Sequence, residues 1–158
     1  MNSQFYTTTI KKATAVSFSE SGFFITPTQL NLIVAKYNCL EIYLINEHGL
    51  SLLSETELYG QIEIMKVFRP KNKFTDLVFI VTAQYNAMIL EFTQTSDKIE
   101  IITKGYCNVF DNLEVATGFM ATVDPDATIV MLKLFERIFK IIPLDNEDEL
   151  KLKVYSYM

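Results

Sequence analysis

The only histidine of this 158-residue chain, His48, is the residue whose type comes closest to acid–base chemistry. It lies in a predicted turn beside Glu47 and Gly49, and a general base needs an oriented partner within hydrogen-bonding reach. The adjacent Glu47 is expected to point elsewhere. We therefore interpret His48 as a solvated turn residue, and a hydrolase that uses His48 is the least favoured hypothesis.

The two cysteines, Cys39 and Cys107, lie in apolar stretches without a histidine nearby and without metal-ligand spacing. Cysteines in such surroundings behave as small hydrophobic side chains, and this pair is compatible with reduced thiols in an intracellular protein. The sequence has no glycine-rich phosphate loop and no CxxC, HExxH or GxSxG motif. We predict no catalytic, cofactor-binding or metal-binding residue, and hence a protein that is not an enzyme and needs no cofactor.

One acidic cluster could in principle bind a hard cation. Its members are Asp145, Glu147, Asp148 and Glu149. Their spacing does not match an EF-hand, and a run of charges in a surface turn is usually solvated. A solvated turn is therefore the favoured interpretation.

A basic connection contains Arg69, Lys71 and Lys73 around Pro70 and could contact phosphate. No aromatic stacking platform is interleaved with these residues, as single-stranded nucleic acid would require. The whole chain has 19 acidic and 14 basic residues, and its net charge of −5 repels phosphate. We predict contact with nucleic acid only indirectly, through partner proteins.

The elements that must position these residues are predicted to be strands. Twelve Phe and eight Tyr favour β-structure, and no window has a sustained helical period. Residues 79–92 form two apolar runs around Tyr85 and Asn86, which predicts a hairpin buried on both faces. Asn86 is expected to supply the left-handed conformation of the turn.

The same pattern occurs at 33–42 around Tyr37 and Asn38, and in weaker form at 130–142 around Phe135. The copies recur at intervals of about 50 residues, which is typical of four-stranded propeller blades. Tyr37 and Tyr85 could face a partner, although equivalent blade positions more often serve packing.

The predicted fold is all-β: a partial β-propeller of about three four-stranded antiparallel blades in an open arc, within one domain region, 1–158. The blades are expected at roughly 31–58, 61–103 and 119–157. Short strands are expected at 5–10 and 13–18, and a loop at 19–28.

Closed propellers have typically 4–8 blades, so three blades leave sheet faces exposed to solvent. The favoured explanation is a piece of a longer protein; the alternative is a partner or second copy that completes the ring, and the fragment is expected to self-associate. The longest uncharged run, 77–90, is too short to span a bilayer as a helix, so no membrane association is expected.

The sequence of the repeats resembles that of one family, the large subunit of the damaged-DNA-binding complex, in the N-terminal part of its first propeller. The matching stretches are Leu-Asn-Leu-Ile-Val-Ala-Lys at 30–36, Leu-Glu-Ile-Tyr at 40–43, Phe-Arg-Pro-Lys at 68–71, Tyr-Asn-Ala at 85–87, Ile-Leu-Glu at 89–91, Ile-Ile-Thr at 101–103, Phe-Lys at 139–140 and Ile-Pro-Leu-Asp at 142–145. They cover nearly the whole chain. The segment 106–117 departs from the family pattern and lacks its basic character.

The resemblance implies a non-enzymatic protein-interaction scaffold in a cullin-type ubiquitin ligase, linked to DNA-damage recognition. Family members have three propellers: the first and third receive substrate receptors and the second engages the cullin. The expected localisation is the nucleus and cytoplasm. The alternative is a scaffold subunit of the related splicing or pre-mRNA cleavage factors.

Overall fold

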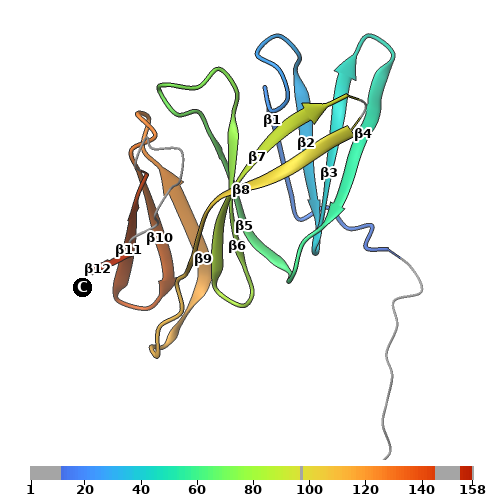
Figure 1. The fold of residues 1–158 in the computed structure, drawn as a ribbon. Coiled ribbons are helices and arrows are strands. Elements are labelled where there is room, and N and C mark those ends of the chain that lie inside the picture. Colours follow the sequence, from blue (N-terminus) through green and yellow to red (C-terminus); the bar gives the residue numbers. More distant parts are fainter. Residues whose placement is uncertain (1–11, 97, 145–153, 158) are drawn as a thin grey trace, which may run out of the picture.

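The computed structural model describes residues 12–96, 98–144 and 154–157, and every regular element within them is a strand. No helix in these residues is long and apolar enough to cross a bilayer. The strands form three four-stranded antiparallel sheets, each in chain order (Figure 1). The all-β prediction of a partial, open propeller is confirmed.

The strand bounds are as follows. The first sheet contains β1 (Phe18–Gly22), β2 (Asn31–Lys36), β3 (Cys39–Asn46) and β4 (Gly49–Glu57). The second contains β5 (Ile62–Phe68), β6 (Leu77–Thr82), β7 (Asn86–Thr95) and β8 (Lys98–Asn108). The third contains β9 (Val115–Val123), β10 (Ile129–Phe135), β11 (Ile138–Pro143) and β12 (Tyr155–Tyr157).

The three sheets lie side by side with the second in the middle (Figure 1). Strand β5 contacts both β1 and β9, so the first strands of the sheets lie together along one side of the arc. Propeller blades converge on a central axis in this way.

Two hydrophobic cores fill the spaces between neighbouring sheets. Every residue of β6 is buried, because successive side chains point alternately into the two cores. Phe79 and Val81 pack toward the third sheet, whereas Val78 and Ile80 pack toward the first. This explains the apolar run of β6. The second strand of the predicted hairpin, β7, is not buried on both faces, because buried and partly buried residues alternate along much of it.

The structure corrects the predicted start of the first sheet. Strand β1 occupies Phe18–Gly22 and so runs into the loop predicted at 19–28, whereas residues 13–17 of the strand predicted at 13–18 contain no strand. Phe18 pairs with Ala35 and Gly22 with Asn31, so antiparallel pairing to β2 outweighs the polar sequence of β1. The strand expected at 5–10 lies outside the described residues.

The prediction for the hairpin turn was wrong in one respect. The left-handed residue is Tyr85, with φ 61°, and its counterparts are Tyr37 (φ 56°) and Arg137 (φ 61°). Asn86 begins β7 instead. The amide of Tyr85 donates to the carbonyl of Thr82 at 2.8 Å, and its ring packs in the core between the second and third sheets. These contacts offset the cost of the left-handed conformation, about 1 kcal/mol or more for such a residue.

Candidate functional site

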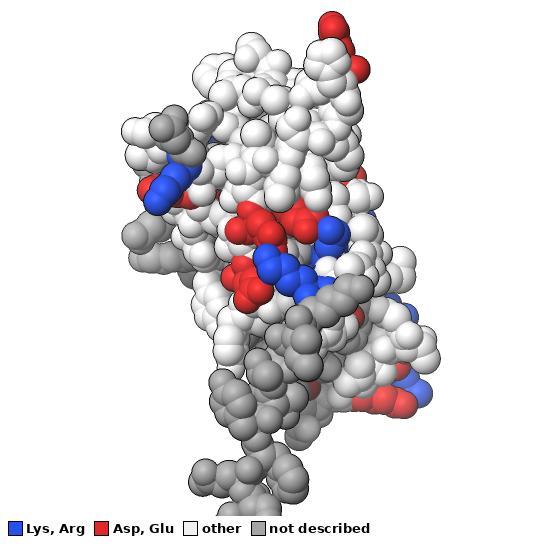
Figure 2. Space-filling model, turned by 90° about the vertical axis from the view of Figure 1, so that its right-hand side faces the viewer, with Lys and Arg blue, Asp and Glu red and all other residues white. Residues whose placement is uncertain are grey.

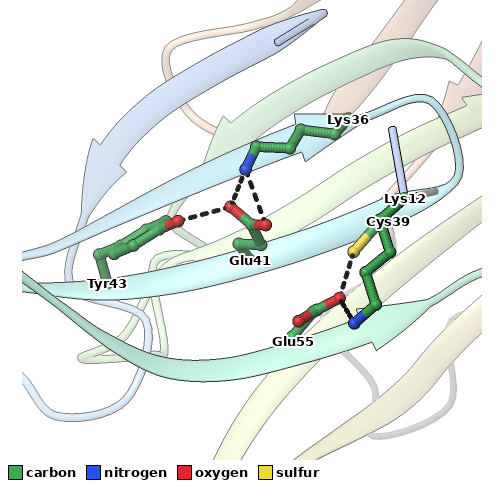
Figure 3. Close-up of polar contacts among 6 residues, drawn as sticks. All are labelled: Lys12, Lys36, Cys39, Glu41, Tyr43 and Glu55. Carbon is green, nitrogen blue, oxygen red and sulfur yellow. Dashed lines mark hydrogen bonds and ion pairs between the residues drawn. The ribbon is translucent and has the colours of Figure 1, made fainter. Parts of the chain in front are cut away.

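A network of charged side chains lies on the open face of the first sheet (Figure 3). Alternation along β3 puts Cys39, Glu41 and Tyr43 on this face, and Glu55 of β4 lies directly opposite Glu41. Glu41 accepts hydrogen bonds from the Lys36 ammonium (2.8 Å) and the Tyr43 hydroxyl (2.6 Å). Figure 2 shows acidic and basic side chains gathered in the middle of an otherwise largely uncharged face.

The second half of this network surrounds Glu55. Its carboxylate accepts hydrogen bonds from the Lys12 ammonium and from the Cys39 thiol, the latter at 3.7 Å. The ligand atoms of Cys39, Glu41 and Glu55 lie within 4.8 Å of one another, a spacing that metal sites also have. They border a pocket of about 320 Å³ that Tyr37, Asn38 and Glu57 also line.

Internal partners account for the charges of this cluster. Burial raises the pKa of Glu41, but hydrogen bonds from Lys36 and Tyr43 outweigh it and leave the pKa below its ordinary value. Burial, followed by the charge of Glu55, raises the pKa of Cys39. A protonated thiol is a poor nucleophile and a poor metal ligand. The cluster is therefore best described as a compensated ion-pair network.

The structure separates the other residues whose types suggested chemistry. His48 lies in the exposed turn between β3 and β4, where its amide donates to Asn46 Oδ1 at 2.9 Å. Cys39 begins β3 at the opposite end, about 20 Å away along an extended strand. Burial raises the pKa of Cys107, in β8, to about 11. The acidic cluster Asp145, Glu147, Asp148 and Glu149 lies outside the described residues.

Each cationic group of the basic connection is paired with a carboxylate. Arg69 donates two hydrogen bonds to Asp76, at 2.8 and 3.0 Å. Lys71 lies 3.0 Å from Asp126 in an exposed pair, and Lys73 pairs with Glu91. The connection therefore presents neutralised pairs instead of an open cationic surface.

Asp76 also joins the first sheet to the second. Its Oδ2 accepts a hydrogen bond from the Phe23 amide at 2.7 Å, and its own amide donates to the Phe23 carbonyl at 2.8 Å. The Arg69 guanidinium lies over the Phe23 ring, 5.3 Å from the centroid. A Cβ on Gly22 would come within 2.7 Å of Asp76 Oδ2, so this close approach requires glycine. We refer to Phe23, Arg69 and Asp76 as the carboxylate clasp.

Aromatic rings seal the junction between the second and third sheets. Tyr85 is stacked on Phe135 with centroids 5.4 Å apart, and it contacts Phe110 and Phe119 at 5.5 and 6.0 Å. The Lys140 ammonium lies 5.5 Å from the centroid of Phe135. Tyr85 thus serves packing, whereas its counterpart Tyr37 is 54% exposed.

The outer face of the third sheet is largely apolar, and none of the described strands packs on it. Its large side chains alternate with those directed into the core and come from all four strands. They are Met120, Ile129, Met131, Phe139, Tyr155 and Tyr157, which are 37–65% exposed. Large exposed apolar patches occur at interaction sites, at ligand grooves and where a protein is prone to aggregate.

The sequence analysis missed the first-sheet network and the aromatic contacts between the second and third sheets, because their members come from different strands. The alternation of Cys39, Glu41 and Tyr43 was a usable signal for the network. Lys140 and its partner Asp111 are 29 residues apart, and no local pattern connects them.

Comparison with known proteins agrees with this architecture. Residues 9–156 match the family described as RSE1/DDB1/CPSF1 first beta-propeller. The chain is 41% identical to DNA damage-binding protein 1 of Drosophila melanogaster over 94% of its own length. It is 37% identical to DNA damage-binding protein 1b of Arabidopsis thaliana and 36% identical to DNA damage-binding protein 1 of Solanum lycopersicum, over 92% of its length in each case. It spans 13% of the length of each of these relatives. The chain belongs to the RSE1/DDB1/CPSF1 family, and its three sheets are part of the first β-propeller of that family.

Proposed function

We propose that this chain is a non-enzymatic interaction scaffold, the N-terminal part of an adaptor that links DNA-damage recognition to a cullin-type ubiquitin ligase. The observation that carries the proposal is the family match over residues 9–156. Relatives at 36–41% identity bear the name DNA damage-binding protein 1. The proposed partners are substrate receptors and, through the longer protein, a cullin.

The charged groups of the chain support a scaffold over a catalyst. The carboxylates of the first-sheet network are held by Lys12 and Lys36, and both thiols have raised pKa values. Arg69, Lys71 and Lys73 are each paired with a carboxylate. For this reason we assign contact with damaged DNA to partner proteins and not to this chain.

The uncovered third-sheet face supports the view that this chain is a piece of a longer adaptor, in which a further blade packs on that face. Expressed alone, the 158-residue chain is then expected to self-associate through its apolar side chains. Met131→Glu should shift sedimentation velocity profiles toward monomer, because it puts a charge in this face, whereas Ser51→Glu on β4 is the control. A wild-type chain that stays monomeric and binds no hydrophobic dye would contradict the expectation.

The proposed function is tested with the full-length protein that contains this region, purified from its own cells by an affinity tag. We expect a cullin and substrate receptors to co-purify, and the tagged protein to be found in both nucleus and cytoplasm. Co-purification of neither would overturn the proposal. Splicing or cleavage factors in their place would establish the related RNA-processing scaffold instead.

A further inference from the structure

Two sheet faces have no neighbour among the described strands: the open face of the first sheet and the outer face of the third. The second sheet, by contrast, packs with both of its faces, on the first sheet through one core and on the third through the other (Figure 1). The open face of the first sheet corresponds to the face that the second turns toward the first. The outer face of the third corresponds to the face that the second turns toward the third. The two exposed faces are therefore the two halves of a junction that the molecule already makes twice.

The open face of the first sheet combines apolar side chains with an excess of acid. Leu50 and Leu52 of β4 lie opposite Ile45 and Tyr43 of β3 on this face, and the two leucines are 55% and 52% exposed. The charged groups beside them are three carboxylates and two ammonium groups, which belong to Glu41, Glu55, Glu57, Lys12 and Lys36. A protein surface that packs here must be apolar and must not place further carboxylates against this cluster, because unpaired like charges are costly to bury.

The outer face of the third sheet has that chemistry. Within strands β9–β12, Lys133 is the one charged residue on this face, opposite Met120 of β9, because Lys140 points into the second core. Lys133 lies 3.8 Å from Glu136 in the following turn, where Arg137 is exposed. Two cations thus stand against one carboxylate, an excess opposite in sign to that of the first-sheet face.

We propose that a second copy of this chain covers both faces: the third-sheet outer face of each copy packs on the first-sheet open face of the other, and the two arcs close a six-bladed ring. Two arcs of three sheets give six blades, within the typical range of 4–8. A head-to-tail contact closes when its rotation returns to the start, and otherwise it grows into a filament. The curvature of the arc supplies the rotation that closure needs.

The alternative pairings fit the two faces less well. Two first-sheet faces packed together would oppose their acidic clusters, which is destabilising. Two third-sheet faces packed together would leave Leu50 and Leu52 in solvent. The inference specifies the self-association of the 158-residue chain by itself and does not rest on the adaptor role, because further blades of a longer protein would take the same two positions.

Sedimentation velocity of the 158-residue chain over about a hundredfold range of concentration tests the ring. We expect a monomer–dimer equilibrium without larger species. Met131→Glu and Leu52→Glu should each weaken the dimer at least about tenfold, because each change puts a carboxylate into both junctions of the ring. Ser51→Glu is the matched control: Ser51 adjoins Leu52 but lies opposite Leu44, on the other face of the sheet, and should leave the dimer unchanged.

An equimolar mixture of Met131→Glu and Leu52→Glu tests the direction of the contact. The mixture offers one unaltered junction, between the third-sheet face of the Leu52→Glu chain and the first-sheet face of the Met131→Glu chain. A mixed dimer should therefore form more tightly than either variant dimerises alone, as followed with a dye on one of them.

The wild-type profile decides the proposal even if a variant fails to fold. A wild-type chain that stays monomeric, or that grows beyond a dimer as its concentration rises, would overturn the ring. A dimer that Met131→Glu abolishes and Leu52→Glu leaves intact would also overturn it, because the copies would then be joined through their third-sheet faces alone.

Discussion

The junction between the first and second sheets and the junction between the second and third are sealed by different chemistry. At the first, a mainly aliphatic core with one edge-on ring pair, Phe24 and Phe92, is joined to the carboxylate clasp, in which Asp76 receives hydrogen bonds from both sheets. At the second, Tyr85 is stacked on Phe135, and the ammonium of Lys140 lies over the Phe135 ring. The repeat therefore preserves strand pairing, while each junction has its own side chains and the sheets are not interchangeable.

The two tyrosines of the repeat show the same difference at a single position. Tyr37 and Tyr85 share the left-handed turn conformation. Tyr85 is stacked on Phe135 of the next sheet, whereas the ring of Tyr37 is largely exposed beside the pocket of the first-sheet network. Equivalent backbone thus places the same side chain in a core in one sheet and on a surface in another.

Phe135→Ala is expected to have the largest effect on the second junction. It should lower the free energy of unfolding by about 4 kcal/mol, because it empties a fully buried site and removes the stacking partner of Tyr85. The matched change in the first junction is Phe24→Ala, where a fully buried ring has one edge contact, with Phe92. We expect about 3 kcal/mol there, measured for both variants by urea denaturation. A larger loss of unfolding free energy for Phe24→Ala than for Phe135→Ala would contradict the view that ring stacking contributes more to the second junction.

Asp76→Ala tests the carboxylate clasp of the first junction. The change leaves the Phe23 amide without its acceptor and the Arg69 guanidinium without its partner, so it should cost about 3 kcal/mol in urea denaturation. Asp126→Ala removes the exposed pair with Lys71 and should cost less than about 0.5 kcal/mol. Similar values for the two variants would mean that the clasp contributes no more than a surface ion pair.

Gly22→Ala probes how closely the first two sheets approach each other. The added methyl group would clash with Asp76 Oδ2 and touch the Phe24 ring, and we expect a loss of about 1–2 kcal/mol in thermal denaturation. Gly118→Ala in β9 is the control, because a Cβ there meets nothing within 4 Å. If both variants have the same melting temperature, the junction between the first two sheets has more room around Gly22 than the structure shows.

The sequence predicted the features that depend on local pattern. The apolar run of β6 predicted a strand buried on both faces, because successive side chains of a strand point to opposite faces of the sheet. The recurring Tyr-Asn pairs, about 50 residues apart, predicted the repeat. Strand β1 was missed because its Ser and Glu residues become ordered only through pairing with β2. The turn residue was misassigned to Asn86 because the ring contacts that hold Tyr85 come from the third sheet. The first-sheet network and the Lys140–Asp111 pair depend on contacts across strands and could not be read locally.

The smallest expected effect appears only in acid and belongs to the second junction. The hydrogen bond from Lys140 holds the pKa of Asp111 below its ordinary value of 3.8. A carboxyl with a lower pKa in the folded than in the unfolded chain contributes stability above the unfolded-state pKa, and that contribution is lost as the pH falls through the folded-state pKa. Asp111→Asn removes this titration. The free energy of unfolding, measured by urea denaturation between about pH 2 and pH 7, should therefore fall less steeply at acid pH in the variant than in the wild type. The measured quantity is the slope of the free energy of unfolding against pH. The overall loss of stability is not informative, because a buried ammonium without its partner lowers stability at every pH. Identical slopes would show that Lys140 does not favour the charged form of Asp111, and the second junction would then lose the feature that most separates it from the first.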